Sequence, residues 1–314
     1  MSDKQPAQVQ PADDGAIARA VHVLRSGGLV AVPTETVYGL AARADCTDAV
    51  AAIYAAKGRP DFNPLIVHVA DVEQARELAL FDDRAELLAR HFWPGPLTLV
   101  LPLRPAARLA PAVTAGLPTI ALRMPAHPVM RALLCEAGVP LAAPSANRSG
   151  AVSPTSAAHV AGSLGDAVPL ILDGGPCARG VESTIVALRA DGGWELLRPG
   201  PVSAAEIDAL LGDAAPGDND TIEAPGQLAS HYAPGKPVRL NAARGAPDEF
   251  MIGFGDIGGD CTLSARGDLT EAAARLYACL HEAAASAKPR VAIAAVPETG
   301  IGVAINDRLR RAAA

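Results

Sequence analysis

The chain has 314 residues, of which half are hydrophobic and 19% are charged, so it is long enough for about two domains with buried cores. Acidic residues outnumber basic ones by 34 to 27, and the net charge of −7 argues against a broad surface for nucleic acids or anionic membranes. The five cysteines include no C-x-x-C pair, so we expect neither a zinc site nor a disulfide framework.

The first residues and the apolar segments bear on the location of the protein. Residues 1–12 are polar and lack the apolar core of a secretory signal, so we expect a disordered tail there. No apolar run in the sequence approaches the roughly 20 residues that a membrane-spanning helix needs. We therefore expect a cytoplasmic protein with no membrane partner.

Short apolar strands alternate with helices between residues 13 and 212. Asp13 or Asp14 begins a helix in which Ile17, Val21 and Leu24 keep a helical period. Further helices are predicted over 47–57, after 71, over 85–92 and 129–137, after 153 and over 203–211. Strands are predicted over 29–32, 65–69, 97–101, 119–123, 140–143 and 169–172, followed by a hairpin of 182–188 with 194–197. This order predicts a mixed-direction open sheet covered by helices.

The composition changes after residue 212. Residues 213–237 are rich in Asp, Gly, Pro and Asn, which is typical of a linker or a long functional loop, yet they contain the unusual pair His231-Tyr232. A small α/β unit follows, with strands over 238–240, 249–254 and 290–296 and helices over 270–287 and 301–311. We expect four segments, namely the tail 1–12, a domain over 13–212, a linker over 213–237 and a domain over 238–314.

Common nucleotide and hydrolase motifs are absent or misplaced in this sequence. Gly253-Phe-Gly-Asp-Ile-Gly258 matches the dinucleotide pattern G-x-G-x-x-G, but a loop over 259–267 separates it from the next predicted helix. No P-loop, G-x-S-x-G elbow or H-E-x-x-H helix occurs in the sequence. Nucleophilic and zinc hydrolysis therefore lack their usual markers.

Lys57 and Arg59 stand at the end of a predicted helix, on a turn that Gly58 and Pro60 stiffen. A simple role for either cation is to complement the helix macrodipole, which is worth about 0.3–1 kcal/mol. Paired donors on a rigid turn before a strand are also a way to build a phosphate cradle. A second polar loop, Ala143-Pro-Ser-Ala-Asn147, follows another apolar segment, and we expect the two loops to face each other around a nucleotide.

Other polar positions have both a structural and a functional interpretation. A lone strand histidine such as His68 is more often a satisfied core group than a ligand. Arg123 closes a predicted strand, where burial demands an anion, either a neighbouring carboxylate or that of a substrate. Ser145 and Asn147 belong to a small polar loop that usually means only a turn.

Six short motifs occur together, and in this order they resemble the YrdC-like domain of L-threonylcarbamoyladenylate synthases over about residues 15–212. The motifs are Pro33-Thr-Glu-Thr-Val-Tyr-Gly39, Lys57-Gly-Arg59, Asn63-Pro-Leu65, Trp93-Pro-Gly-Pro-Leu-Thr98, Pro144-Ser-Ala-Asn147 and Glu182-Ser-Thr184. His231-Tyr-Ala-Pro234 and the α/β tail resemble the long two-domain form of that family. The resemblance implies a YrdC-like open twisted mixed sheet with helices, plus a small Rossmann-like α/β C-terminal domain.

The resemblance also implies a reaction. These nucleotidyltransferases condense L-threonine, bicarbonate and ATP into threonylcarbamoyl-AMP and pyrophosphate, and the product passes to the tRNA threonylcarbamoyl transferase machinery. A threonine carbamate attacks the α-phosphorus, and no covalent enzyme intermediate forms. Such chemistry depends on positioning and charge neutralisation, for which Lys57, Arg59 and a Mg²⁺ ion carried by ATP are suited.

Carried over position by position, the resemblance names a site. It implies that ATP is bound by Arg59, Asn63, Thr119, Ser145, Asn147, Ser153, Arg198 and Tyr232. It implies that L-threonine is held by Thr36, His68, Arg123, Ser183 and the backbone of Ala143. No protein side chain is expected to bind the metal. Gln227 departs from the family, whose members often carry a lysine or other long residue near that position.

Two other functions compete with this interpretation. A carbamoyl-adenylate-forming maturation factor shares the domain, but such proteins carry zinc-finger-like and acylphosphatase-like segments that this sequence lacks. The other is an RNA-binding or translation-associated YrdC-like module without catalysis, which the acidic net charge disfavours. Tight RNA binding whose affinity falls steeply with salt concentration, without pyrophosphate release, would favour that module.

Overall fold

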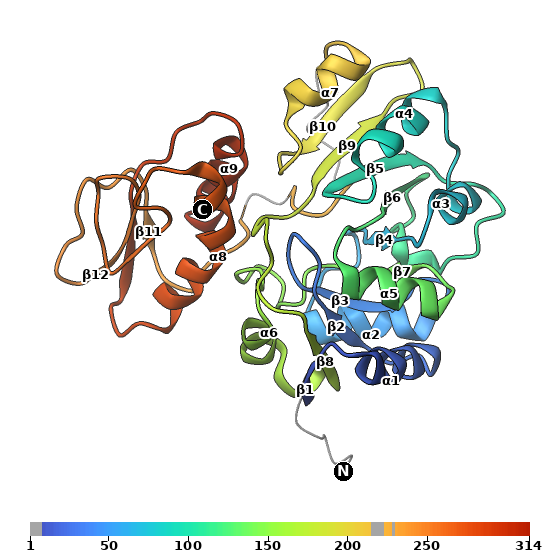
Figure 1. The fold of residues 1–314 in the computed structure, drawn as a ribbon, viewed down its shortest axis with the longest axis horizontal. Helices are drawn as coiled ribbons and strands as arrows, with labels where there is room; N and C mark the ends of the chain where they lie inside the picture. The colour runs from blue at the N-terminus through green and yellow to red at the C-terminus, as the bar shows by residue number, and fades with distance from the viewer. Residues whose placement is uncertain (1–7, 215–222, 228–229) are drawn as a thin grey trace.

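The computed structural model describes residues 8–214, 223–227 and 230–314, and Figure 1 shows two units side by side. The larger unit contains a ten-stranded sheet in the order β1-β8-β2-β3-β7-β4-β6-β5-β9-β10, and the smaller one a four-stranded sheet in the order β11-β14-β12-β13. Both sheets are accompanied by helices, so the predicted α/β fold class is confirmed. No helix in the described ranges is long and apolar enough to cross a membrane.

The elements of the larger unit fall mostly where the sequence predicts them. The strands are β1 (Gln8–Pro11), β2 (Val30–Val32), β3 (Gly39–Arg43), β4 (Ile66–His68), β5 (Leu97–Pro102), β6 (Thr119–Arg123), β7 (Leu141–Ala142), β8 (Leu170–Asp173), β9 (Thr184–Leu188) and β10 (Trp194–Arg198). The helices are α1 (Asp14–Arg25), α2 (Thr47–Lys57), α3 (Val72–Leu78), α4 (Asp83–Phe92), α5 (Pro128–Ala137), α6 (Ala157–Leu164) and α7 (Ala204–Leu211), with 3-10 turns η1 (Pro111–Val113) and η2 (Gly165–Ala167).

The large sheet mixes parallel and antiparallel pairs, as the sequence predicts. β4 pairs in parallel with β6 and antiparallel with β7, while β5 pairs antiparallel with β6 and in parallel with β9. His68 and Arg123 are register partners at the ends of β4 and β6. Their side chains therefore start from neighbouring points at the same edge of the sheet.

Residues 8–11 correct the prediction of a disordered tail over 1–12. They form β1, an edge strand parallel to β8, in which Gln8 N donates to Pro169 O at 3.1 Å. Main-chain hydrogen bonds account for this strand, because Val9 remains 47% exposed and no apolar pattern signals it. Residues 1–7 lie outside the described residues.

Local signals explain where α1 begins and where α2 ends. Asp13 accepts a hydrogen bond from Ala16 N at 2.7 Å and caps α1, whose apolar face is buried as its period predicts. α2 ends at Gly58, whose φ of +58° is left-handed and favours glycine. Lys57 consequently lies in the last turn of α2, and Arg59 lies just beyond it.

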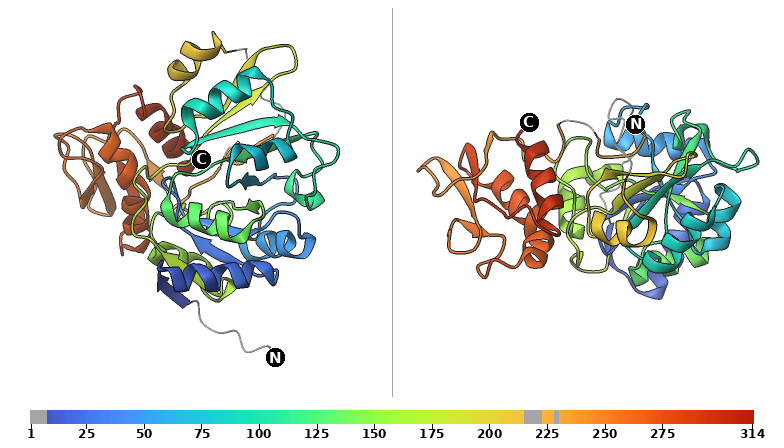
Figure 2. Two further views of the ribbon diagram at one scale, coloured as in Figure 1. Left: turned by 45° about the vertical axis from the view of Figure 1, so that its right-hand side comes forward. Right: turned by 90° about the horizontal axis from the view of Figure 1, so that it is seen from above.

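The smaller unit places its two helices toward the larger one (Figures 1 and 2). It contains β11 (Val238–Arg239), β12 (Glu249–Gly253), β13 (Cys261–Thr262), β14 (Arg290–Ile293), α8 (Leu269–Ala285) and α9 (Gly302–Ala312), and its strand pairs are parallel. After β12, Phe254 and Ile257 bond to each other, and the chain continues into β13. The G-x-G-x-x-G stretch therefore opens no helix, which a pyrophosphate site would need.

The apolar core of the smaller unit extends into the larger one. Its buried cluster includes Val37, Val152 and Val181 from the larger unit and Tyr232 from the connecting segment. Tyr277 of α8 belongs to the same cluster. The two units are therefore packed against each other beside the segment that joins them.

Candidate active site

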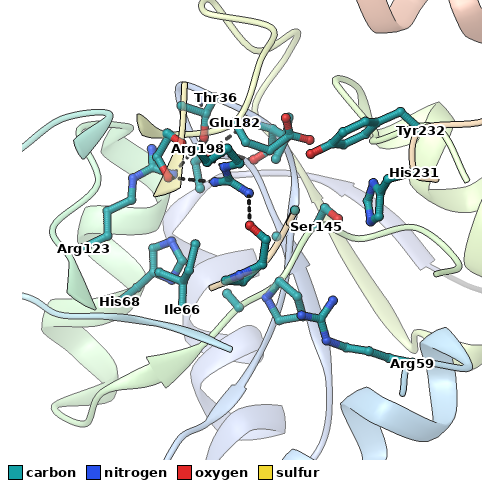
Figure 3. A pocket seen from close by; sticks show the side chains of 18 residues that line it. Thr36, Arg59, Ile66, His68, Arg123, Ser145, Glu182, Arg198, His231 and Tyr232 are labelled. Carbon is teal, nitrogen blue, oxygen red and sulfur yellow. Dashed lines mark hydrogen bonds between the residues drawn. The ribbon is translucent and has the colours of Figure 1, made fainter. Parts of the chain in front are cut away.

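A cavity lies beside His68 and Arg123, and the segment around Tyr232 closes its opposite side (Figure 3). Nine of the fourteen residues predicted for the site line this cavity, namely Thr36, Arg59, His68, Arg123, Ala143, Ser145, Ser183, Arg198 and Tyr232. Four of the other five bond to a lining residue, namely Lys57, Asn63, Asn147 and Ser153. Thr119 begins β6 and is not among the lining residues.

Arg59, which is half-buried, and Arg198, which is buried, bring two guanidinium groups to the cavity. Arg59 Nη2 donates to Asn63 Oδ1 at 2.6 Å and to Pro64 O at 2.8 Å, which aims the side chain along its own loop. Arg198 Nε donates to Ser183 O, and its Nη2 donates to Ser183 Oγ, both at 3.1 Å. Burial, together with the charge of Arg198, lowers the pKa of Arg59 to about 10. Like charges that converge in a buried cavity favour an anionic ligand.

Arg123 adds a third guanidinium, and it already has a carboxylate partner. Its Nη2 donates to Glu35 Oε1 at 2.5 Å, its Nη1 donates to Thr36 Oγ1 at 2.8 Å, and its Nε donates to Gly95 O at 3.2 Å. Although burial opposes the shift, Arg123 lowers the pKa of Glu35. The structural interpretation of Arg123 as half of a salt bridge is therefore present in the fold. An arginine has five N–H donors, so two remain for a ligand carboxylate.

Two imidazoles line the cavity with a ring nitrogen unpaired. The Nδ1 atoms of His68 and His231 are buried and have no hydrogen-bond partner among the described residues. Burial, and secondly Arg123, lowers the pKa of His68 to about 3, and burial lowers that of His231 to about 4. Both rings are therefore neutral at pH 7. Buried polar atoms without partners are uncommon and indicate a missing ligand or water.

Lys57 lies behind the loop that contains Ser145. Its Nζ donates to Ser145 O and to Asn147 O, each at 2.5 Å, and the side chain is buried. Burial, and secondly Arg59, lowers the pKa of Lys57 well below its ordinary value. These contacts join the two loops that the sequence predicts to face each other, because Lys57 ends the helix before one loop and binds the carbonyls of the other.

Glu182 is the acidic residue of the described lining, and the sequence predicted no role for it, although it belongs to one of the six motifs. It is buried, and its carboxylate accepts from Ser153 Oγ at 2.6 Å, from Tyr277 Oη at 2.7 Å and from Arg308 Nε at 3.1 Å. Two of these donors lie in the C-terminal unit, far along the chain. No local pattern around Glu182 reveals these donors. The available signal was an acidic residue at the start of a predicted strand, because such a residue needs partners if it is buried.

Two family models together match nearly the whole chain. The model described as Telomere recombination matches residues 22–200, and the one described as Threonylcarbamoyl-AMP synthase, C-terminal domain, matches residues 202–314. The threonylcarbamoyl-AMP synthase of Bacillus subtilis is 43% identical, covering 96% of this chain and 94% of the relative. That of Pyrococcus abyssi is 40% identical, covering 93% and 92%. The chain belongs to the threonylcarbamoyl-AMP synthase family.

A solved structure of a family member has the same fold throughout. The crystal structure of P. abyssi Sua5 complexed with L-threonine matches with a TM-score of 0.87 and 37% identity, covering 98% of this chain and 96% of that one. The resemblance inferred from the six motifs and the expected nucleotidyltransferase class are thereby confirmed. The roles of individual residues remain predictions.

Proposed function

We propose that the cavity binds ATP and L-threonine and, with bicarbonate, forms threonylcarbamoyl-AMP and pyrophosphate. The observation that carries the proposal is the meeting of Arg59, Arg123 and Arg198 with the unpaired Nδ1 atoms of His68 and His231 in one buried cavity. A nucleotide triphosphate and an amino-acid carboxylate are anions that such a set of donors binds. The L-threonine in the P. abyssi Sua5 structure supports the choice of amino acid.

We assign the phosphates to the side of the cavity that contains Arg59, Ser145 and Arg198. Asn63, Asn147, Ser153, Thr119 and Tyr232 are the further nucleotide residues of this proposal. In the reaction a carbamate oxygen forms a bond to the α-phosphorus, the bond to the bridging oxygen breaks, and pyrophosphate leaves with the electron pair. Fixed guanidinium groups stabilise the charge that develops on the phosphate oxygens.

We assign threonine to the adjoining part of the cavity, near Thr36, His68, Ala143 and Ser183. The two remaining N–H groups of Arg123 suit its carboxylate, so that Glu35 would orient the guanidinium rather than compete for it. The neutral His68 ring offers Nδ1 as a short polar contact for the ligand. A threonine hydroxyl paired in such a pocket would disfavour analogues that lack it, because a buried polar group would lose its partner.

Unlike the three arginines, Lys57 does not line the cavity, and its ammonium is bonded to backbone carbonyls. Its ammonium must exchange the carbonyls of Ser145 and Asn147 for phosphate oxygens before it contacts ATP. In the geometry of the structure it acts by holding the Ser145 loop at the end of α2. We therefore propose that Lys57 contributes to turnover through the shape of that loop, with direct contact to phosphate as the alternative.

A magnesium ion fits this site only as part of the nucleotide complex. No group of three or more metal-ligating side chains occurs within residues 8–214, 223–227 and 230–314. The lining carboxylate, Glu182, already accepts three hydrogen bonds. Mg²⁺ carried by ATP would neutralise phosphate charge during the transfer. The protein's part is to hold the phosphates with Arg59 and Arg198.

The test is pyrophosphate release by the full-length protein with threonine, bicarbonate or ATP omitted in turn. We expect release only with all three present, and less than about a tenth of the rate when any is missing. Carbamoyl phosphate in place of threonine and bicarbonate tests the maturation-factor reaction, and filter binding to RNA across a salt series tests the RNA-binding module. Release with carbamoyl phosphate and ATP in the absence of threonine and bicarbonate, or RNA binding that weakens steeply with salt and is not accompanied by release, would overturn the proposal.

We further propose that the product passes to the tRNA threonylcarbamoyl transferase machinery in the cytoplasm. A mixed anhydride of a carbamate and AMP is an activated acyl donor, so the reaction that consumes it must transfer the threonylcarbamoyl group to a nucleophile. Adding that machinery and unmodified tRNA to the assay should convert the intermediate into threonylcarbamoyladenosine, which mass spectrometry of digested tRNA detects.

A further inference from the structure

The C-terminal unit contributes no residue to the described lining of the cavity, yet it supports two residues that do. The described lining residues end at Tyr232. Glu182 lines the cavity and receives hydrogen bonds from Tyr277 of α8 and Arg308 of α9. These two donors leave one carboxylate oxygen, Oε1, for Ser153.

Arg308 is unusually placed for a charged side chain. It is 0% exposed, and besides Glu182 it bonds through Nη1 to Pro199 O at 2.5 Å and to Asp307 Oδ2 at 3.0 Å. Its guanidinium carbon lies 5.7 Å from the centroid of the Tyr232 ring, which is within the range of a cation–π contact. Its Nη2 atom is buried without a hydrogen-bond partner in the part of the chain that the structure describes.

Tyr232 depends on the same two side chains. Its ring stacks on that of Tyr277 with centroids 5.6 Å apart and planes inclined by 29°. Its backbone has a φ of +65°, a left-handed conformation that tyrosine rarely adopts without tertiary contacts. Its neighbours His231 and Ala233 donate their amides to Arg311 O and Gly150 O. Contacts with α8 and α9, and with the larger unit, therefore fix the position of the segment.

A buried ion pair of this kind gives little net stability, because desolvation of both charges offsets their attraction. Removing one partner is costly, since it leaves the other charge buried and uncompensated. The pair between Glu182 and Arg308 is consequently better explained by the geometry that it imposes than by the stability that it adds. That geometry includes both Glu182 and Tyr232, on the same part of the cavity.

We propose that Tyr277 and Arg308 are positioning residues of the active site: through Glu182 and Tyr232 they complete a cavity that the C-terminal domain does not itself line. This inference rests on the proposed function for its kinetic consequences. Because Tyr232, Ser153 and Arg198 belong to the proposed nucleotide side, loss of either positioning residue weakens the binding of ATP more than that of threonine.

The kinetic test compares Arg308→Met and Tyr277→Phe with Arg310→Met in the full-length protein. Arg310 lies on the same helix but is 56% exposed, and it pairs with an equally exposed Glu298. We expect the KM for ATP to rise about tenfold or more in Arg308→Met and about threefold in Tyr277→Phe, and to stay within about twofold in Arg310→Met. A lower kcat with both KM values unchanged would indicate only a loss of active protein and would overturn the proposal.

A double variant tests whether Arg308 acts through Glu182. In the Glu182→Gln background the carboxylate that lines the cavity is gone, and Asp307, the other acid beside Arg308, keeps its pair with Arg311, so Arg308→Met should raise the KM for ATP by less than about threefold. The contrast with the larger rise in the wild-type background is the signature of coupling. If the fold-rises in the KM for ATP caused by the two substitutions multiply instead, Arg308 does not act through the carboxylate.

Hydrogen exchange separates this inference from the proposed function, because it needs no turnover. The amides of His231 and Ala233 should exchange at least about tenfold faster in Arg308→Met than in wild type or Arg310→Met. If wild type fails to release pyrophosphate while exchange rises as expected, only the proposed function is lost. Unchanged exchange in folded Arg308→Met, or in Tyr277→Leu, which removes the ring that stacks on Tyr232, should the first variant not fold, would overturn the positioning role.

Discussion

The cavity also divides by origin into a first side from the larger unit and a second side from the connecting segment, and these two sides are built in different ways. Arg59 lies just after the end of α2, Arg123 is the last residue of β6, and hydrogen bonds to nearby loops orient both side chains. Tyr232, in contrast, comes from the connecting segment, and Tyr277 and Arg308 of the C-terminal unit place it. Under the proposed function, a substitution on the first side removes a proposed contact with the substrate, whereas one behind the second side displaces a residue that is still present. This difference predicts distinct kinetic and stability effects.

The largest expected effect comes from the cations of the first side. Arg59→Ala should lower kcat/KM for pyrophosphate release by about 10² or more, because a preorganised charge partner of the transition state is lost. Lys57→Ala should have a similar effect through displacement of the Ser145 loop, to which its ammonium bonds. The exposed Arg76→Ala is the matched control. Retention of more than about a tenth of wild-type turnover by Arg59→Ala would exclude that role.

A smaller and more selective effect is expected at Arg123. In Arg123→Lys the KM for threonine should rise about tenfold or more, with a lesser change for ATP, because an ammonium cannot contact Glu35, Thr36 and a carboxylate together as the guanidinium fork does. Steady-state kinetics with each substrate varied in turn measure the two KM values, and the exposed Arg104→Lys serves as control. Equal rises for both substrates would argue against a threonine site beside Arg123.

A pair of glycines probes the contact between the two units. At Gly180 an added Cβ would lie 2.3 Å from Ala273 O and 2.4 Å from Ala274 Cα in α8, while at Gly138 it would meet open space. Their φ angles, +69° and +70°, are nearly equal. Urea unfolding should show Gly180→Ala less stable than Gly138→Ala by about 1–3 kcal/mol, the usual cost of overpacking. Equal losses of unfolding free energy in the two variants would mean that α8 can shift away from residue 180 at no cost in stability.

The smallest expected effect is a pH dependence of stability from His68. Its pKa of about 3 in the folded protein lies below the unfolded value, so at pH values between the two the unfolded chain binds a proton that the folded chain does not bind. Stability is therefore lost as pH falls from about 6.5 toward 3. In His68→Asn the slope of unfolding free energy between pH 6 and 4.5 should decrease, by up to about 1.4 kcal/mol per pH unit. An identical slope would show that His68 is protonated in the folded protein.

Much of the first side could be predicted from the sequence because its signals are local. The 3.6-residue period and the cap at Asp13 predicted α1, and the position of Arg123 at the end of a strand predicted a buried charge that needs an anion. The edge strand β1 was missed, since main-chain bonds to β8 leave no mark on side-chain patterns. The part of the linker over 215–222 and 228–229 lies outside the described residues.

Sequence alone determined the fold class, the family and half of the residues that line the cavity, because strand ends, caps and short motifs depend on neighbours along the chain. Tertiary structure alone decided the partners of the buried charges. Glu35 binds Arg123, Lys57 binds the carbonyls of another loop, and Glu182 is held by Tyr277 and Arg308. A buried charge takes its partners from whatever the packing brings beside it, and spacing along the chain does not encode that proximity.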